Sequence, residues 1–209
     1  MRILRVSSRA GRPCHSVNTD TIWQSLPILE GGRVRLRALS DQDIDALFTI
    51  FSNPEVMRYW SFTPLVDRDA AAALLNSTLE GFERRWLMKW GVVLRDSDEL
   101  IGTVTLINLD FTHCRAEIGY ALARAFWGKG YIQEALNLLI EYAFQQLELH
   151  RIEADVDPRN AASIRTLERL GFKREGFLRE RWQVGGELQD ALFYGLLRPE
   201  WEEAQRAKG

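Results

Sequence analysis

Two glycines stand one residue apart at the start of a helical stretch. They are Gly128 and Gly130, in the segment 126–135 that reads FWGKGYIQEA. Glycine reaches backbone angles that other residues avoid, and it has no side chain to keep a ligand away. Such a turn points several free N–H groups outward at the positive end of the helix dipole. The spacing predicts an anion cradle for a phosphate or pyrophosphate, with an ordinary glycine turn as the alternative.

Three further motifs flank this turn in a fixed order. Residues 115–122 read RAEIGYAL, residues 160–163 read NAAS and residues 170–172 read LGF. Together the four motifs resemble those of the GNAT acyltransferases, and more narrowly the branch that contains the ribosomal-protein N-terminal acetyltransferases. The resemblance covers about residues 32–200. It implies acetyl-coenzyme A (acetyl-CoA) as donor, a primary amine as acceptor, and a sheet splayed between the strand ending near Leu122 and the strand at 151–156.

The resemblance also implies where the coenzyme binds. A backbone N–H near Leu122 is the expected donor to the thioester oxygen, and Asn160 both caps a helix and can bond the pantetheine arm. Lys129 and Arg124 are expected to help the backbone N–H groups hold the pyrophosphate, with a solvated surface lysine as the alternative for Lys129. The implied coenzyme-binding residues are Leu122, Arg124, Phe126, Trp127, Gly128, Lys129, Gly130, Tyr131 and Asn160.

Two side chains are predicted to carry the chemistry. Amine acylation requires a neutral amine, whereas an alkyl ammonium is mostly protonated at pH 7, so a base is needed. Glu117 is the predicted base, with pairing to Arg115 or solvent as the alternative. Ser163 lies one helical turn after Asn160 and resembles a serine that helps to protonate the departing thiolate. An orienting or water-relay role, and a plain position on the helix surface, are the alternatives for Ser163.

The chain departs from the family pattern at two positions. Ala125 stands where many members have Gln or Arg, so the cradle would depend on backbone N–H groups. Leu167 stands where many members have a tyrosine that protonates the thiolate. Alternation along the strand places Tyr120 on the opposite face from Glu117, lining the cleft, unless a bulge changes the parity.

The acceptor side is predicted from aromatic residues. Tyr59 and Trp60 precede Pro64 in a loop, where they are expected to bind the acceptor or, alternatively, to pack on the core. The acceptor is expected to be a protein N-terminus or a small amine such as a polyamine. The acids Asp41, Asp43 and Asp45 lie near a helix start and are interpreted as capping residues.

These features predict an N-acetyltransferase that moves acetyl from acetyl-CoA to a primary amine by direct attack in a ternary complex. Cys114 lies outside the cradle motifs, with no His/Asp arrangement evident, so no covalent nucleophile is indicated. A non-catalytic acyl-CoA-binding sensor or scaffold module is the alternative, which the missing tyrosine at Leu167 favours and Glu117 and Ser163 disfavour.

Composition sets the outer limits. The 209 residues carry a net charge of −2 and are 46% hydrophobic, which is typical of a globular protein with no global attraction to nucleic acid or to a membrane. Cys14 and Cys114 show no metal spacing, so we expect no metal and interpret both as free thiols in a reduced, cytoplasmic setting. The resemblance to the branch that contains the ribosomal-protein N-terminal acetyltransferases also implies a possible homodimer.

Periodicity predicts the elements that position these residues. Strands are expected at 33–38, 89–95, 100–108, 115–123, 151–156, 172–183 and 187–197, and helices at about 41–52, 67–82, 132–147 and 161–170. The fold class is α/β (α+β), a GNAT-like mixed, mostly antiparallel sheet of about seven strands with helices on both faces. The predicted domains are a loosely ordered N-terminal extension at 1–31, a GNAT acetyltransferase domain at 32–200 and a C-terminal tail at 201–209.

Overall fold

The computed structural model describes residues 19–207 of the chain. Its helices are α1 (Thr19–Ile22), α2 (Ile44–Phe51), α3 (Pro54–Met57), α4 (Arg68–Glu83), α5 (Tyr131–Gln145), α6 (Ala161–Arg169) and α7 (Arg198–Arg206), with short 3₁₀ turns at Asp41–Asp43 and Arg124–Phe126. Its strands are β1 (Leu29–Glu30), β2 (Val34–Arg37), β3 (Leu87–Leu94), β4 (Leu100–Asp110), β5 (Arg115–Leu122), β6 (Arg151–Val156), β7 (Lys173–Val184) and β8 (Glu187–Leu197).

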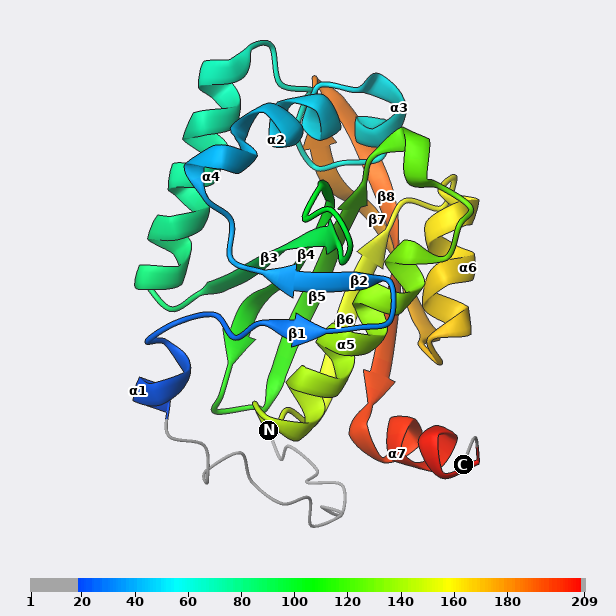
Figure 1. Ribbon diagram of the computed structural model, residues 1–209. Helices are drawn as coiled ribbons and strands as arrows, with labels where there is room; N and C mark the ends of the chain where they lie inside the picture. Colours follow the sequence, from blue (N-terminus) through cyan, green and yellow to red (C-terminus); the bar gives the residue numbers. More distant parts are fainter. Residues whose placement is uncertain (1–18, 208–209) are drawn as a thin grey trace.

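These strands form one mixed sheet in the order β1-β2-β3-β4-β5-β6-β8-β7 (Figure 1). All neighbours are antiparallel except β5 and β6. This confirms the predicted mostly antiparallel sheet, with the two-residue β1 added to the seven strands expected. The hairpin turn between β7 and β8 lies at Gly185 and Gly186, whose positive φ values of 58° and 90° explain the two glycines.

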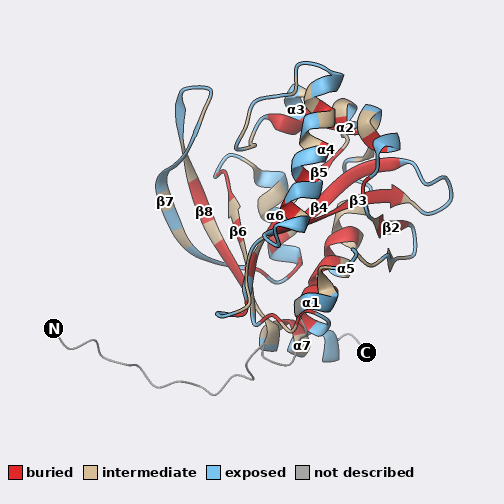
Figure 2. Ribbon diagram, turned by 90° about the vertical axis from the view of Figure 1, so that its left-hand side faces the viewer, coloured by how far each residue is buried: buried red, intermediate tan, exposed pale blue. Residues whose placement is uncertain are grey.

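Helices cover both faces of the sheet, as predicted. One face packs β3, β4 and β5 against α5, through side chains such as Trp90, Ile118 and Leu139. The other face packs Val93 and Ala121 against α2, α3 and α4. In Figure 2, α2 and α3 lie above the buried strands β3 and β4, and α5 lies below them. Strand alternation therefore assigns each side chain of β5 to one of two different layers.

Strands β5 and β6 separate after a short paired segment. They pair in parallel from Arg115 to Glu117 on β5 and from Arg151 to Glu153 on β6, and no further. Beyond that point β5 remains paired with β4 as far as Leu122, while β6 remains paired with β8. The register of β4 with β5 is continuous from Glu117 to Leu122, so no bulge changes the predicted face of Glu117. The splay predicted from the family resemblance is thus present.

The ends of the described chain pack on the domain. Residues Leu29–Glu30 pair with β2, and Trp201 of α7 is 9% exposed and packs against Phe144. The predicted divisions at residues 31 and 201 therefore fall beside packed elements, and the division into extension, domain and tail stays a prediction. Within residues 19–207, no helix is both long and apolar enough for a membrane crossing.

Cys114 is disulfide-bonded, so the predicted free thiol is wrong at this position. The free-thiol interpretation rested on an expected reduced setting, which does not determine whether a given cysteine meets a partner in the fold. Cys14 lies outside the described residues.

Candidate active site

A cavity of about 360 Å³ lies where β5 and β6 separate. Its walls come from β3 to β6, the start of α6, the loop after α3 and the β7–β8 hairpin. The structure brings together here five of the predicted site residues, which are Glu117, Ser163, Asn160, Tyr59 and Trp60. Because the cavity passes through the splay, side chains from both faces of the sheet reach it. Its volume is in the range usual for small-molecule sites.

The carboxylate of Glu117 is half-buried in this cavity. The Nδ2 of Asn108 donates a hydrogen bond to its Oε2 at 3.2 Å. Burial raises the pKa of Glu117 above its usual range, and the nearby charge of Asp155 adds to that effect. A carboxylate with a raised pKa is a stronger base, which suits proton transfer near neutral pH. The alternative pairing with Arg115 is not formed, because Arg115 bonds Glu153 at 3.0 Å.

Two hydroxyl groups meet on the other side of the splay. The Oη of Tyr120 and the Oγ of Ser163 are 2.5 Å apart. Burial raises the pKa of Tyr120 to about 12, so its hydroxyl stays protonated at neutral pH. The backbone N–H of Ser163 donates to the Oδ1 of Asn160 at 3.1 Å, which confirms Asn160 as the cap of α6. The sequence interpretation placed Tyr120 in the cleft but missed its pairing with Ser163. The one signal for this pairing was Leu167, which stands where many family members have the tyrosine that protonates the thiolate.

The glycine turn has the backbone of an anion cradle. Gly128 and Gly130 have φ values of 74° and 82°, in the left-handed region that favours glycine. A Cβ at Gly128 would meet no described atom within 4 Å, so this backbone is open. The N–H groups of Gly128, Lys129 and Gly130 donate to no backbone carbonyl of residues 19–207. The first N–H groups of α5 have no intrahelical acceptor either, and they point the same way.

The backbone of β5 also presents N–H groups to the splay. Ala123 N donates to Ile101 O at 2.8 Å, and the register places Leu122 opposite Gly102. Hydrogen bonds to one neighbour alternate along an antiparallel strand, so the N–H groups of Leu122 and Tyr120 point away from β4. They point toward the side where β6 has diverged, which suits the predicted role of the Leu122 N–H. The Nε1 of Trp127 donates to the Leu122 carbonyl at 2.7 Å and ties the turn to the strand end.

Arg124 and Lys129, the two side chains predicted to help hold the pyrophosphate, lie close to other groups of the protein. Arg124 pairs with Glu55 at 2.7 Å and lies over the ring of Trp127, so its charge is already engaged. The ammonium of Lys129 lies 5.5 Å from the ring centre of Phe126.

Arg33 is a turn residue that the sequence interpretation missed. Its guanidinium donates to the Lys129 carbonyl at 2.9 Å, pairs with Glu134 of α5 at 2.9 Å and lies over the ring of Tyr131. In the sequence, Arg33 appeared only as one of three alternating arginines on an exposed strand face. These contacts connect the glycine turn to the start of β2, and Glu134 engages the charge of Arg33 as Glu55 engages that of Arg124.

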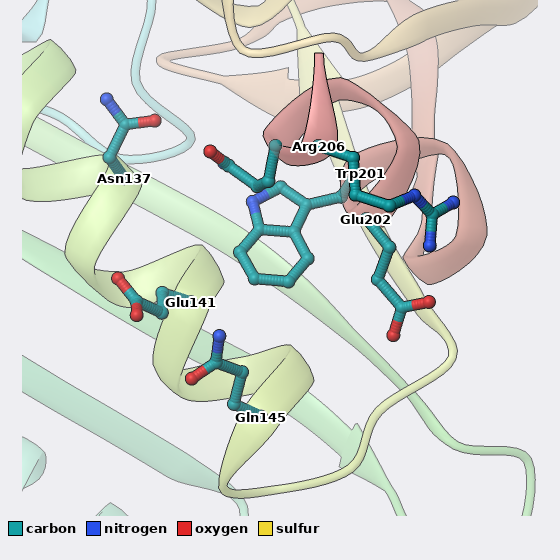
Figure 3. A pocket seen from close by; sticks show the side chains of 7 residues that line it. Asn137, Glu141, Gln145, Trp201, Glu202 and Arg206 are labelled. Carbon is teal, nitrogen blue, oxygen red and sulfur yellow. The ribbon is translucent and has the colours of Figure 1, made fainter. Parts of the chain in front are cut away.

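A second hollow lies between α5 and α7, away from this site (Figure 3). Figure 3 shows Asn137 and Glu141 of α5 facing Trp201 of α7. None of the predicted site residues lines it.

The splayed sheet, the cavity at the splay and the open glycine turn are the features expected of an acyltransferase. Residues 33–173 match the family described as acetyltransferase (GNAT) domain. The chain belongs to the GNAT family and is an acetyl-CoA-dependent N-acetyltransferase, which confirms the resemblance of the four motifs.

Named relatives agree with the family. The chain is 39% identical to the uncharacterized N-acetyltransferase p20 of Bacillus licheniformis over 81% of its length and 95% of that protein. It is 34% identical, over 81% of its length and 93% of that protein, to Bacillus subtilis YdaF, whose name assigns it provisionally to the ribosomal N-acetyltransferases. The solved spermidine N-acetyltransferase from Vibrio cholerae, in complex with CoA and spermine, superposes with a TM-score of 0.73 at 27% identity, covering 82% of this chain and 99% of that one.

Proposed function

We propose that the enzyme acetylates a primary amine by direct attack on acetyl-CoA in a ternary complex. One observation carries the proposal. The same cavity, at the splay of β5 and β6, contains the carboxylate of Glu117 and the hydroxyl pair of Tyr120 and Ser163. A base on the acceptor side and an acid on the donor side are what this transfer requires.

Binding of acetyl-CoA is assigned to the glycine turn and the end of β5. The N–H groups from Gly128 into α5 hold the pyrophosphate, and Arg33 fixes the turn through its hydrogen bond to the Lys129 carbonyl. Asn160 lies where the pantetheine arm would enter the splay, and the Leu122 N–H polarises the thioester carbonyl. The side chains of Phe126, Trp127, Lys129 and Tyr131 are proposed to contact the outer part of the coenzyme, and Arg124 lies over the ring of Trp127.

The transfer step follows from these positions. Glu117 takes a proton from the ammonium, directly or through a water, and the amine nitrogen attacks the thioester carbonyl carbon. The carbon–sulfur bond breaks, and the thiolate receives a proton from Ser163, which Tyr120 orients and supplies. The attacking nitrogen loses its second proton as the amide forms, and this proton returns through solvent to the Tyr120–Ser163 pair. An amide and a free thiol result, and Glu117 releases the first proton to solvent.

The acceptor is proposed to enter beside Tyr59 and Trp60. Both line the cavity, and Trp60 also packs edge-on against Phe51, with 5.3 Å between the ring centres. The packing alternative is thus formed for Trp60, and acceptor binding by both residues stays a prediction. The name of one relative refers to ribosomal N-acetylation, and the name of a solved neighbour refers to spermidine. A homodimer and a cytoplasmic location stay predictions.

The proposal is tested by incubating the protein with acetyl-CoA and a panel of amines and measuring thiol release. Amine-dependent release, with the acetylated amine identified by mass spectrometry, supports the proposal. Tight acetyl-CoA binding without release on any amine would instead identify the non-catalytic binding module.

Removing the hydroxyl of Ser163 is expected to slow the transfer. The Ser163→Ala variant should lower kcat about 100-fold, and Tyr120→Phe about tenfold, because the acid and then its hydrogen-bonded partner are lost. Steady-state kinetics at saturating acetyl-CoA measures both. Thr166→Ala removes a hydroxyl from the same helix that bonds only the Ala162 carbonyl, and it should leave kcat unchanged. An equal loss in all three variants would mean that the effect is on helix stability.

A further inference from the structure

A lysine lies buried in the acceptor half of the cavity. Lys89 is in the middle of β3, is 9% exposed and lines the cavity together with Glu117. Its ammonium contacts the face of the Phe51 ring, 5.9 Å from the ring centre. A buried lysine at the middle of a strand is unusual, because burial of a charge costs free energy unless a partner compensates it.

Lys89 forms no ion pair with any carboxylate of residues 19–207. Two of the carboxylates of the cavity are in ion pairs, whereas Glu117 and Asp190 are in none within the described part of the chain. Asp155 pairs with Arg181 at 3.0 Å, and Asp157 pairs with Arg159 at 2.7 Å. Burial lowers the pKa of Lys89 to about 8, so the group still carries its proton for the most part at pH 7. Lys89 is therefore a cation of the cavity with which no carboxylate of residues 19–207 forms an ion pair.

The surface of the sheet between Lys89 and Glu117 is open to the cavity. In the sheet register, Lys89 lies opposite Thr105, and Thr105 lies opposite Gly119 on β5. A Cβ at Gly119 would meet no described atom within 4 Å, so the space above it is open. Glu117 is two residues from Gly119 on the same face of the strand. Adjacent strands are about 4.8 Å apart, so Lys89 and Gly119 are about 10 Å apart at the backbone, a span that a small molecule can fill.

We propose that Lys89 binds an anionic group of the acceptor, so that the acceptor is an amine that carries a carboxylate or similar oxyanion a few bonds from its amino group. This inference rests on the proposed function and names the substrate class for it. In this pose the amine faces Glu117 and the anion faces Lys89.

The same geometry disfavours a polyamine. In the proposed pose, a second ammonium on the acceptor would lie toward Lys89 and meet a like charge there. The acidic run near α2 does not compensate, because Asp43 pairs with Arg37, Asp45 pairs with Arg68, and neither lines the cavity. This chain is thus expected to differ in acceptor preference from the spermine-bound neighbour.

The experiment compares three acceptors of matched length, 4-aminobutanoate, 1-aminobutane and 1,4-diaminobutane. The wild-type kcat/KM is expected to be highest for 4-aminobutanoate and lowest for the diamine. Two C-terminally amidated peptides, Glu-Ala-Ala and Gln-Ala-Ala, distinguish the source of the anion. Preference for the Glu peptide over 4-aminobutanoate places the anion on a peptide N-terminus, and the reverse places it on a free small molecule.

The Lys89→Met variant keeps the length of the side chain and removes its charge. It should raise KM for the preferred anionic acceptor about tenfold with kcat little changed, leave 1-aminobutane unaffected and improve the diamine. Lys173→Met, which removes an exposed charge paired with Glu200, is the matched control and should change none of these values.

The wild-type acceptor order tests the inference even if a variant does not fold. A diamine that is the best wild-type acceptor, or an unchanged KM in Lys89→Met, would overturn the inference while the acetylation of amines still upheld the proposed function. Acetylation of none of the five compounds would overturn both.

Discussion

Glu117→Gln is expected to lower kcat about 100-fold while the Kd for acetyl-CoA stays near its wild-type value. Glutamine has nearly the same shape and can still accept the hydrogen bond from Asn108, but it cannot take a proton from the ammonium. Loss of a positioned base typically costs two to four orders of magnitude, so about 100-fold is the low end. Kinetics at saturating acetyl-CoA and equilibrium binding measure the two quantities.

The pH profile separates a base from a binding residue. Burial raises the pKa of Glu117, so wild-type kcat/KM should fall, as pH decreases, at a pH above the ordinary glutamate range. Comparing both proteins with the same amine cancels the titration of the amine itself. The fall of kcat/KM at low pH that is due to Glu117 should be absent in Glu117→Gln. An unchanged pH profile in this variant would reject Glu117 as the base.

The same substitution is expected to stabilise the fold at neutral pH. Because the folded-state pKa of Glu117 is raised, the protonated form favours folding, and that contribution is lost as pH rises through the folded pKa. Glutamine resembles the protonated form at every pH, so the Tm of the variant should exceed that of the wild type at pH 8 and match it more closely at pH 5. Glu141→Gln, at an exposed position of α5 away from the cavity, is the control for both kinetics and Tm.

Gly128→Leu is expected to raise the Kd for acetyl-CoA at least tenfold, about 1.4 kcal/mol of binding free energy. The new side chain would meet no protein atom within 4 Å at its Cβ, so it would occupy the approach to the open N–H groups of the turn. A φ of 74° is also unfavourable for leucine, which would displace those groups from their present directions. Isothermal titration with acetyl-CoA measures the change.

Gly186→Leu provides the matched control for backbone strain. Gly186 also has a positive φ, 90°, and open space around its Cβ position, but it lies in the β7–β8 hairpin turn. Both variants should lose stability to a similar extent, whereas Gly128→Leu alone should weaken acetyl-CoA binding. Equal binding by the two variants would show that the turn does not contact the coenzyme.

Much of the fold could be predicted because its signals are local. The apolar positions of α5 recur at helical spacing, Asn160 precedes α6 as a cap, and the β7–β8 turn carries paired glycines. The family motifs added the splay. The short α1, β1 and α3 were missed, since two to four residues are too few to show a period. The helix α7 was missed as well, because most of it was assigned to the C-terminal tail.

The candidate site was predicted where its residues lie in motifs, and missed where they do not. Glu117, Asn160 and Ser163 lie in ordered motifs, and all three line the cavity. Arg33 lies about one hundred residues before the turn that it contacts, and no local pattern links the two. Tyr120 was correctly placed in the cleft, but its bond to Ser163 spans 43 positions of sequence.

The sequence by itself determined the elements, the face of each β5 side chain and the open backbone of the glycine turn, because each depends on the conformational preferences of neighbouring residues. Only the tertiary structure decided which groups meet. The separation of β5 from β6 opens the cavity, brings Tyr120 to Ser163 and leaves Lys89 buried with no ion-pair partner among residues 19–207. Those outcomes depend on long-range strand pairing and on burial, which set the distances and the desolvation that periodicity alone does not contain.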